Sequence, residues 1–152
     1  MKKLTRAAAV ALAGAAALSG AAVMNAPTAS AAAMRQTSIY LHNGTGCTLN
    51  LVESPLAHGG WYIDPLSSIG NTQDALFKAG SIGFMTGDEG HVTYRASDCE
   101  EGWRNGHTVY LYFDNPYAGS NAYAENGDGA FRFTRSGGSG DDAVVYWGAW
   151  KA

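Results

Sequence analysis

Short runs of alternating apolar and polar residues, separated by turn-forming residues, constrain this chain more than any other feature. From about residue 34 onward, Gly, Ser, Asn or Asp interrupts the sequence roughly every eight to twelve residues. Between these interruptions the apolar residues recur at every second position, which is the period of a β-strand and not of a helix. The pattern therefore predicts a fold made of short strands.

The clearest alternation lies at 108–113, where Val109, Leu111 and Phe113 share one face and the two tyrosines between them share the other. Eight to ten such strands in about 120 residues predict an all-β, single-domain antiparallel β-sandwich. The other runs that we interpret as strands are 38–42, 48–53, 61–63, 75–79, 81–85, 91–95, 131–134 and 143–147. We interpret 86–90 as a turn.

The first 31 residues have the features of a secretory signal peptide. A basic start, MKKLTR, precedes an uncharged alanine-rich run, and Ala29-Ser30-Ala31 fits the small-x-small pattern of a cleavage site. We expect a cut after Ala31, or as late as residue 33, and a sandwich domain at 34–152. The alanine-rich run is only weakly apolar, which disfavours a membrane anchor. The sequence thus predicts a secreted, extracellular protein.

Charge excludes one large class of partners. Removing the predicted signal peptide leaves seven basic residues against thirteen acidic ones, a formal charge of −6. This charge repels a phosphate backbone, and no cluster of Lys or Arg offsets it. We therefore expect no nucleic-acid binding.

Two cysteines remain in the predicted mature chain, Cys47 and Cys99. In an oxidising compartment, an isolated pair in a small domain most simply forms one disulfide. A metal site is the alternative, but neither cysteine has a Cys or His nearby at ligand spacing. The sequence predicts a Cys47–Cys99 bridge.

No catalytic or metal-binding pattern stands out. Ser81 lies in GSIG and not in a Gly-x-Ser-x-Gly elbow, and the four histidines form neither an HExxH motif nor a close pair. Acidic turns at 88–90, 125–129 and 141–142 offer oxygen ligands for calcium, but none fits the twelve-residue calcium loop. We predict no enzyme, no cofactor and no metal.

Aromatic residues give the strongest functional signal. Tyr and Trp combine an apolar body with a polar tip, so they suit membrane interfaces and the faces of sugars. Tyrosine rings also enclose quaternary ammonium groups by cation–π attraction. The alternative is ordinary cross-strand packing. The stretch FDNPYAGSNAY, 113–123, places Tyr117 and Tyr123 on either side of a proline-stiffened turn.

Two stretches carry a resemblance to a known family. GFMTGDEGHVTYRA (83–96) and TVYLYFDNPYAGSNAY (108–123) resemble the membrane-lipid-binding β-sandwiches of the actinoporin and aegerolysin type, closest to their small secreted bacterial and fungal relatives. The resemblance implies a phosphocholine-type headgroup site at the proline and tyrosine loop. By position, Pro116, Tyr117 and Tyr123 match that loop, and Tyr112 on the preceding strand is a further member.

The residues of this loop are consistent with such a site. Pro116 fixes its own φ and keeps Asn115 out of the helical region, which holds Tyr117 in a defined direction. Asp114 would meet a headgroup amine or cap the turn. We expect Tyr117 and Tyr123 to converge on a concave cradle that is open to solvent.

The resemblance implies a secreted protein that binds a choline- or ethanolamine-type lipid headgroup or a membrane surface, in a toxin-like, cytolysin-related system. Actinoporins perforate membranes with an N-terminal helix, whereas here the first strand begins within about five residues of the predicted cut. The sequence therefore indicates binding without a pore-forming helix of its own, with an unknown protein partner. Two alternatives stay open: a carbohydrate- or cell-wall-binding module with a polysaccharide ligand, and a secreted inhibitor or protein-interaction domain.

Overall fold

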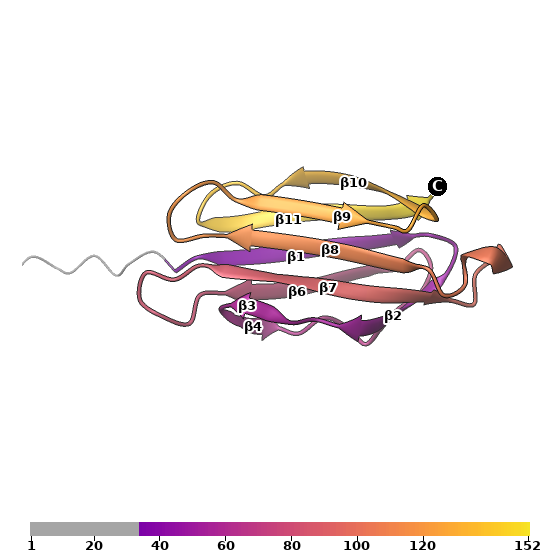
Figure 1. Cartoon of the computed structure of the whole chain (residues 1–152), viewed down its shortest axis with the longest axis horizontal. Helices are drawn as coiled ribbons and strands as arrows, with labels where there is room; N and C mark the ends of the chain where they lie inside the picture. The colour runs from indigo at the N-terminus through magenta and orange to yellow at the C-terminus, as the bar shows by residue number, and fades with distance from the viewer. Residues whose placement is uncertain (1–33) are drawn as a thin grey trace, which may run out of the picture.

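The computed structural model describes residues 34–152, which form two β-sheets packed face to face (Figure 1). The predicted all-β sandwich is confirmed. The expected signal peptide, residues 1–31 with a cut as late as residue 33, lies outside the described residues.

Sheet A has five strands in the order β10-β11-β1-β6-β4. Their bounds are Phe131–Gly137, Asp142–Lys151, Gln36–Gly44, Asp74–Gly80 and Gly60–Ile63. Neighbouring strands are antiparallel except for β1 and β11, which pair in parallel. The prediction of an antiparallel sandwich therefore holds for every pair of this sheet but one.

Sheet B has six strands, in the order β5-β2-β7-β8-β9 with β3 paired to β7. Their bounds are Ser68–Ile69, Thr48–Glu53, Asp88–Ser97, Thr108–Asn115, Ala122–Asn126 and, for β3, Leu56–His58. One turn of 3₁₀-helix, η1, spans Gly102–Arg104. The eleven strands of the described residues slightly exceed the eight to ten that we predicted.

Alternation builds the core as the sequence predicts. Val109, Leu111 and Phe113 of β8 are fully buried, and the tyrosines between them face outward. Trp61 joins the two layers, because its ring lies 5.9 Å from that of Phe77 in sheet A and 5.7 Å from that of Phe113 in sheet B. Edge-on aromatic contacts at such distances add to the free energy gained from burial.

Two of the predicted boundaries are wrong. Residues 81–85 form a loop and not a strand, because the Thr86 hydroxyl bonds the backbone of Gly83 and Met85 adopts a left-handed φ of 55°. The acidic residues that we expected in a turn instead begin β7. Asp88 and Glu89 pair with Asn115 and Asp114 across the ladder, so the turn ends at residue 87.

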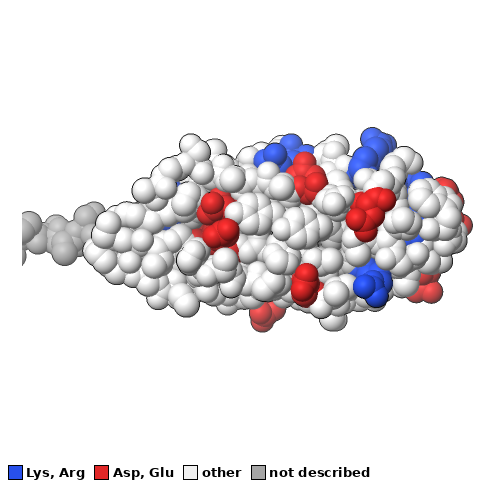
Figure 2. Space-filling view, viewed as in Figure 1, with Lys and Arg blue, Asp and Glu red and all other residues white. Residues whose placement is uncertain are grey.

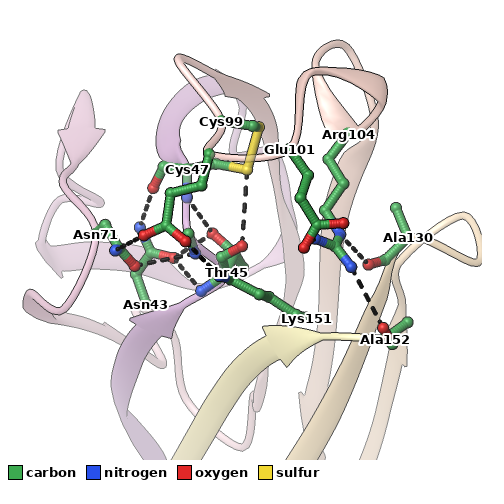
Figure 3. A network of polar contacts seen from close by, with 12 residues as sticks. Asn43, Thr45, Cys47, Asn71, Cys99, Glu101, Arg104, Ala130, Lys151 and Ala152 are labelled. Atoms are coloured by element: carbon green, nitrogen blue, oxygen red, sulfur yellow. Dashed lines mark hydrogen bonds and ion pairs between the residues drawn. A yellow bond between two sulfur atoms is a disulfide. The ribbon is translucent and has the colours of Figure 1, made fainter.

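The predicted disulfide between Cys47 and Cys99 is confirmed. It joins the residue just before β2 to the residue two positions after β7, and these two strands are paired. Figure 3 shows the polar network beside it, which includes Asn43, Thr45 and Asn71. The buried Asn43 amide donates hydrogen bonds to the carbonyls of Cys47, Ile69 and Gly70. This end of the sandwich is therefore cross-linked by both covalent and hydrogen bonds.

The opposite end of the sandwich consists of loops. β1 begins there, and the β6–β7, β8–β9 and β10–β11 connections all lie at that end, at the left of Figure 1. We call residues 81–87, 116–121 and 138–141 together the loop end. The disulfide and η1 belong to the other end.

Candidate functional site

A hollow of about 440 Å³ opens at the loop end. It is lined by His58 and by residues 85–89, 114 and 116–118. Gly87 makes the close packing around it possible, since a Cβ there would lie 2.4 Å from the Asn115 carbonyl oxygen. The β6–β7 and β8–β9 loops therefore meet backbone to backbone. We call this feature the acidic hollow.

Two carboxylates face each other across the strands that form the hollow. Glu89 of β7 and Asp114 of β8 are directly paired in register. Burial and the neighbouring charge of Glu89 raise the pKa of Asp114. Like charges at directly opposite positions destabilise a sheet, so this pair is a cost to the fold. The arrangement suits a bound cation, which would relieve the repulsion.

The acidic pair is held in place by neighbouring side chains. The Tyr112 hydroxyl donates a hydrogen bond of 2.8 Å to Glu89, and His58 Nε2 lies 3.8 Å from the other oxygen of that carboxylate. Burial and the bond to Glu89 raise the pKa of Tyr112 to about 12. Tyr112 therefore stays protonated and remains a donor at ordinary pH.

One basic residue ties the loop end together. Arg35, just before β1, donates a hydrogen bond of 2.7 Å to the Tyr117 carbonyl and forms an ion pair of 2.7 Å with Asp141. Asn115 adds to this clamp by donating to the carbonyls of Gln36 and Asp141, both at 3.0 Å. These contacts fix the backbone beneath Tyr117.

An apolar loop projects beside the acidic hollow. Ile82 is 74% exposed, Phe84 is 82% exposed and Met85 is 52% exposed. Met85 also lines the hollow, so the apolar and acidic surfaces adjoin. Figure 2 shows that the loop end, at the left, is almost free of charged groups on this face. Adjoining exposed apolar side chains of this size mark an interaction site.

Two solved structures share this architecture. The lipid-binding protein Nakanori matches with a TM-score of 0.65 and 15% sequence identity, over 77% of this chain and 71% of that one. IP-1A from Alcaligenes faecalis matches with a TM-score of 0.57 and 12% identity, over 77% of this chain and 91% of that one. The chain has their fold. No protein-family model matches the sequence, and no curated protein matches it.

The structure brings together three of the five residues predicted for the headgroup site. Asp114, Pro116 and Tyr117 all line the acidic hollow. Tyr112 lies beside it, with its ring in a neighbouring hollow of about 250 Å³ and its hydroxyl on Glu89.

Tyr123 does not converge with Tyr117. It pairs with Phe113 across the β8–β9 ladder, so both side chains take the inner face of sheet B. Its ring packs 5.7 Å from that of Trp147, and its hydroxyl donates to the Gly138 carbonyl at 2.9 Å. The expected cradle of two tyrosines is therefore not formed, and the acidic hollow has a single tyrosine ring, that of Tyr117.

Sequence reasoning missed Arg35 and the apolar loop. Arg35 is separated from Tyr117 by 82 residues, so no local pattern relates them. The apolar loop did leave a signal, since Ile82, Phe84 and Met85 stand between Gly80 and Gly87 without a clean alternation. Because we interpreted that run as a strand, we did not predict that these side chains are exposed.

Asp88 lies at the inner wall of the acidic hollow and is fully buried. Neither of its carboxylate oxygens has a hydrogen-bond partner among the described residues. Burial raises the pKa of Asp88 from its ordinary value of 3.8 to about 6, against the opposing effects of Thr37 and Arg35. The native state thus holds a proton on Asp88 more readily than the unfolded chain does.

Replacing Asp88 with Asn is expected to flatten the pH dependence of stability. Because the native pKa exceeds the unfolded one, the wild-type protein loses stability as the pH rises from about 4 to about 6. The loss is on the order of 2 kcal/mol, and Asp88→Asn removes it. Urea unfolding at pH 4, 5, 6 and 7 measures the difference. Parallel curves for the two proteins would contradict the prediction, and Asp64→Asn, at an exposed position, is the control.

Within residues 34–152, no helix is long and apolar enough to cross a bilayer. The same residues contain no group of three or more His, Cys, Asp or Glu side chains placed to hold a metal ion.

Proposed function

We propose that this protein is exported and binds the headgroups of membrane lipids with its loop end. The acidic hollow takes the cationic end of a choline- or ethanolamine-type headgroup, and the apolar loop enters the bilayer interface. Asp114 supplies charge, Tyr117 supplies a ring face, and Pro116 holds that ring in position.

The observation that carries this proposal is the Glu89–Asp114 pair beside an exposed apolar loop. The lining of the hollow contains Asp88, Glu89 and Asp114 but no Lys or Arg. A positively charged group is therefore favoured there, and a free anion is not. Ile82 and Phe84, on the same end, would leave water when the hollow meets a membrane.

The two parts fit the order of groups in a zwitterionic lipid. The ammonium is the outermost group and the phosphate lies deeper. Tyr117 lines the hollow that would take the ammonium, and Arg35 holds the Tyr117 carbonyl, so the ring stands on a fixed backbone. Cation–π attraction to Tyr117 contributes roughly 0.5–2 kcal/mol.

Two further observations support the wider role. Nakanori, whose fold this chain shares, is described as a lipid-binding protein. The Cys47–Cys99 disulfide fits an oxidising compartment and therefore export. The sequence resemblance to actinoporins and aegerolysins extends the proposal to a toxin-like system, in which this chain recognises the membrane and a partner protein perforates it.

Sedimentation with lipid vesicles tests the proposal. We expect the protein to bind vesicles of phosphatidylcholine, sphingomyelin or phosphatidylethanolamine more tightly than vesicles of phosphatidylglycerol. Tyr117→Ala and Asp114→Asn are each expected to lower affinity for the zwitterionic vesicles by about tenfold. Asp114→Asn also relieves the repulsion with Glu89, so this variant should be at least as stable as the wild type.

Matched variants away from the loop end are the controls. Asp98→Asn changes one charge and Tyr146→Ala removes one exposed ring, and both should bind vesicles as the wild type does. If the wild-type protein stays in solution with every zwitterionic vesicle, the proposed function is wrong. If it binds and Tyr117→Ala binds equally well, lipid binding stands and the acidic hollow is not its site.

A further inference from the structure

A second hollow lies on the outer face of sheet A, away from the acidic hollow. Its volume is about 290 Å³, and it extends over β1, β11 and β10. Alternation along these strands points Tyr40, Tyr146 and Trp150 outward on this face. Tyr146 is 53% exposed and Tyr40 is 39% exposed, so these rings are not absorbed by the core. We call this feature the aromatic groove.

Two glycines let the Trp150 indole lie across the sheet. A Cβ on Gly44 would lie 2.3 Å from Cε3 of Trp150, and a Cβ on Gly148 would lie 2.6 Å from its Nε1. The indole therefore occupies the space above both residues, against the backbone. Its Nε1–H donates a hydrogen bond of 3.1 Å to the Thr134 hydroxyl, which fixes the rotation of the ring. The His42 ring lies 5.0 Å from the indole at an angle of 40°, and the two rings together form one wall of the groove.

The two tyrosines form the other wall of the groove. Tyr40 and Tyr146 are paired in register on the parallel strands β1 and β11, and their rings stack at 5.0 Å with an interplanar angle of 18°. Gly148 lies between Tyr146 and Trp150 along β11, and the Trp150 indole lies over it, so the indole itself covers the floor beside the tyrosine wall. A larger side chain at position 148 would displace the indole.

Polar groups surround these rings. His42 Nδ1 lies 2.8 Å from Asp74 Oδ1, and the hydroxyls of Thr134 and Ser136 line the β10 side. Arg135, which also lines the groove, is paired with Glu125 at 3.4 Å. The groove therefore combines flat apolar surfaces with hydrogen-bonding groups, and its arginine is already neutralised by a carboxylate.

We propose that the aromatic groove binds a saccharide, namely a neutral polysaccharide built from β-linked hexopyranose units. Such units have apolar C–H faces that stack on aromatic rings and equatorial hydroxyls that reach groups like the His42–Asp74 pair. The groove's volume of about 290 Å³ lies at the lower limit of the roughly 300–1,000 Å³ typical of ligand pockets, so it suits a single sugar ring with its chain continuing into solvent. An acyl chain requires an enclosed apolar channel, which this open groove lacks. The site is independent of lipid binding.

Titration of the full chain with laminarihexaose, cellohexaose and chitohexaose tests the assignment. We expect at least one of the three to change tryptophan fluorescence on binding. Trp150→Ala is expected to weaken that binding about tenfold or more. Gly148→Val keeps every aromatic ring but displaces the indole, so it should weaken binding to a similar extent. Trp103→Ala, at an exposed position on η1, is the matched control and should bind normally.

The two sites can be separated experimentally. Trp150→Ala should sediment with phosphatidylcholine vesicles as the wild type does, and Tyr117→Ala should retain saccharide binding. Failure of all three hexasaccharides to bind the wild-type protein overturns the saccharide assignment and leaves the lipid proposal standing. A dimer in analytical ultracentrifugation that Trp150→Ala abolishes would also overturn it, because the groove would then be covered by a second copy of the chain.

Discussion

Replacing Ile82 and Phe84 together with serine is expected to lower the affinity for zwitterionic vesicles by at least about tenfold. Complete burial of either side chain is worth about 1.5–3 kcal/mol, and half of that from each gives about 1.5–3 kcal/mol in total, or about 10- to 150-fold. In the folded protein the two side chains are 74% and 82% exposed, so their removal costs the fold little. Vesicle sedimentation over a range of lipid concentrations measures the loss.

The control for this double variant is Trp103→Ser. Trp103 is 57% exposed on η1, at the end of the sandwich away from the loop end. The change therefore removes a large exposed apolar side chain that would not enter the bilayer interface. It should leave vesicle affinity unchanged. Equal loss of binding in both proteins would show that general hydrophobicity, and not the apolar loop, drives association. Thermal unfolding should give nearly the same Tm for the wild type and the loop variant.

Removal of the disulfide by Cys47→Ala with Cys99→Ala is expected to lower the free energy of unfolding by about 3–4 kcal/mol. The bridge closes a loop with a sequence separation of 52, and in the chain-entropy model it restricts the unfolded ensemble by about that amount. Alanine is chosen because Cys47 is fully buried, where a serine hydroxyl would need a partner. For a domain of this size the loss corresponds to roughly 15 °C in Tm.

Urea unfolding of the two proteins, with and without dithiothreitol, measures this effect. Reductant should destabilise the wild type to about the level of the double variant and leave the variant unaffected. A loss below about 1 kcal/mol would contradict the prediction, and it would indicate that the Asn43 network alone holds that end together.

Sequence alone could predict the strands whose two faces differ. The run 108–113 has a buried face and a tyrosine face, and β8 follows that pattern without exception. The run 81–85 failed for a related reason, since its apolar residues face solvent and no neighbouring strand pairs with them. An apolar segment forms a buried strand only when another element of the protein packs against it. That tertiary contact cannot be predicted from the apolar composition of the segment alone.

Only those residues of the candidate site that are adjacent in the chain could be predicted from the sequence. Asp114, Pro116 and Tyr117 are neighbours in the chain, and the stiff turn keeps them neighbours in space. The position of Tyr123 could be predicted only from the β8–β9 register, because a shift of one residue would have placed its side chain on the outer face of sheet B. Arg35 required the tertiary arrangement of strands that are far apart in the chain.

The parallel pairing of β1 with β11 has a consequence for how the protein assembles. The first and last strands of the sandwich are interior neighbours, joined along nine residue pairs from Gln36 with Asp142 to Gly44 with Trp150. The middle of sheet A therefore stays incomplete until the last strand has been synthesised, and contacts of such long range form slowly. Closure of sheet A is therefore expected to be among the last steps of folding, because β1 gains its second neighbour only when the C-terminal strand has become available.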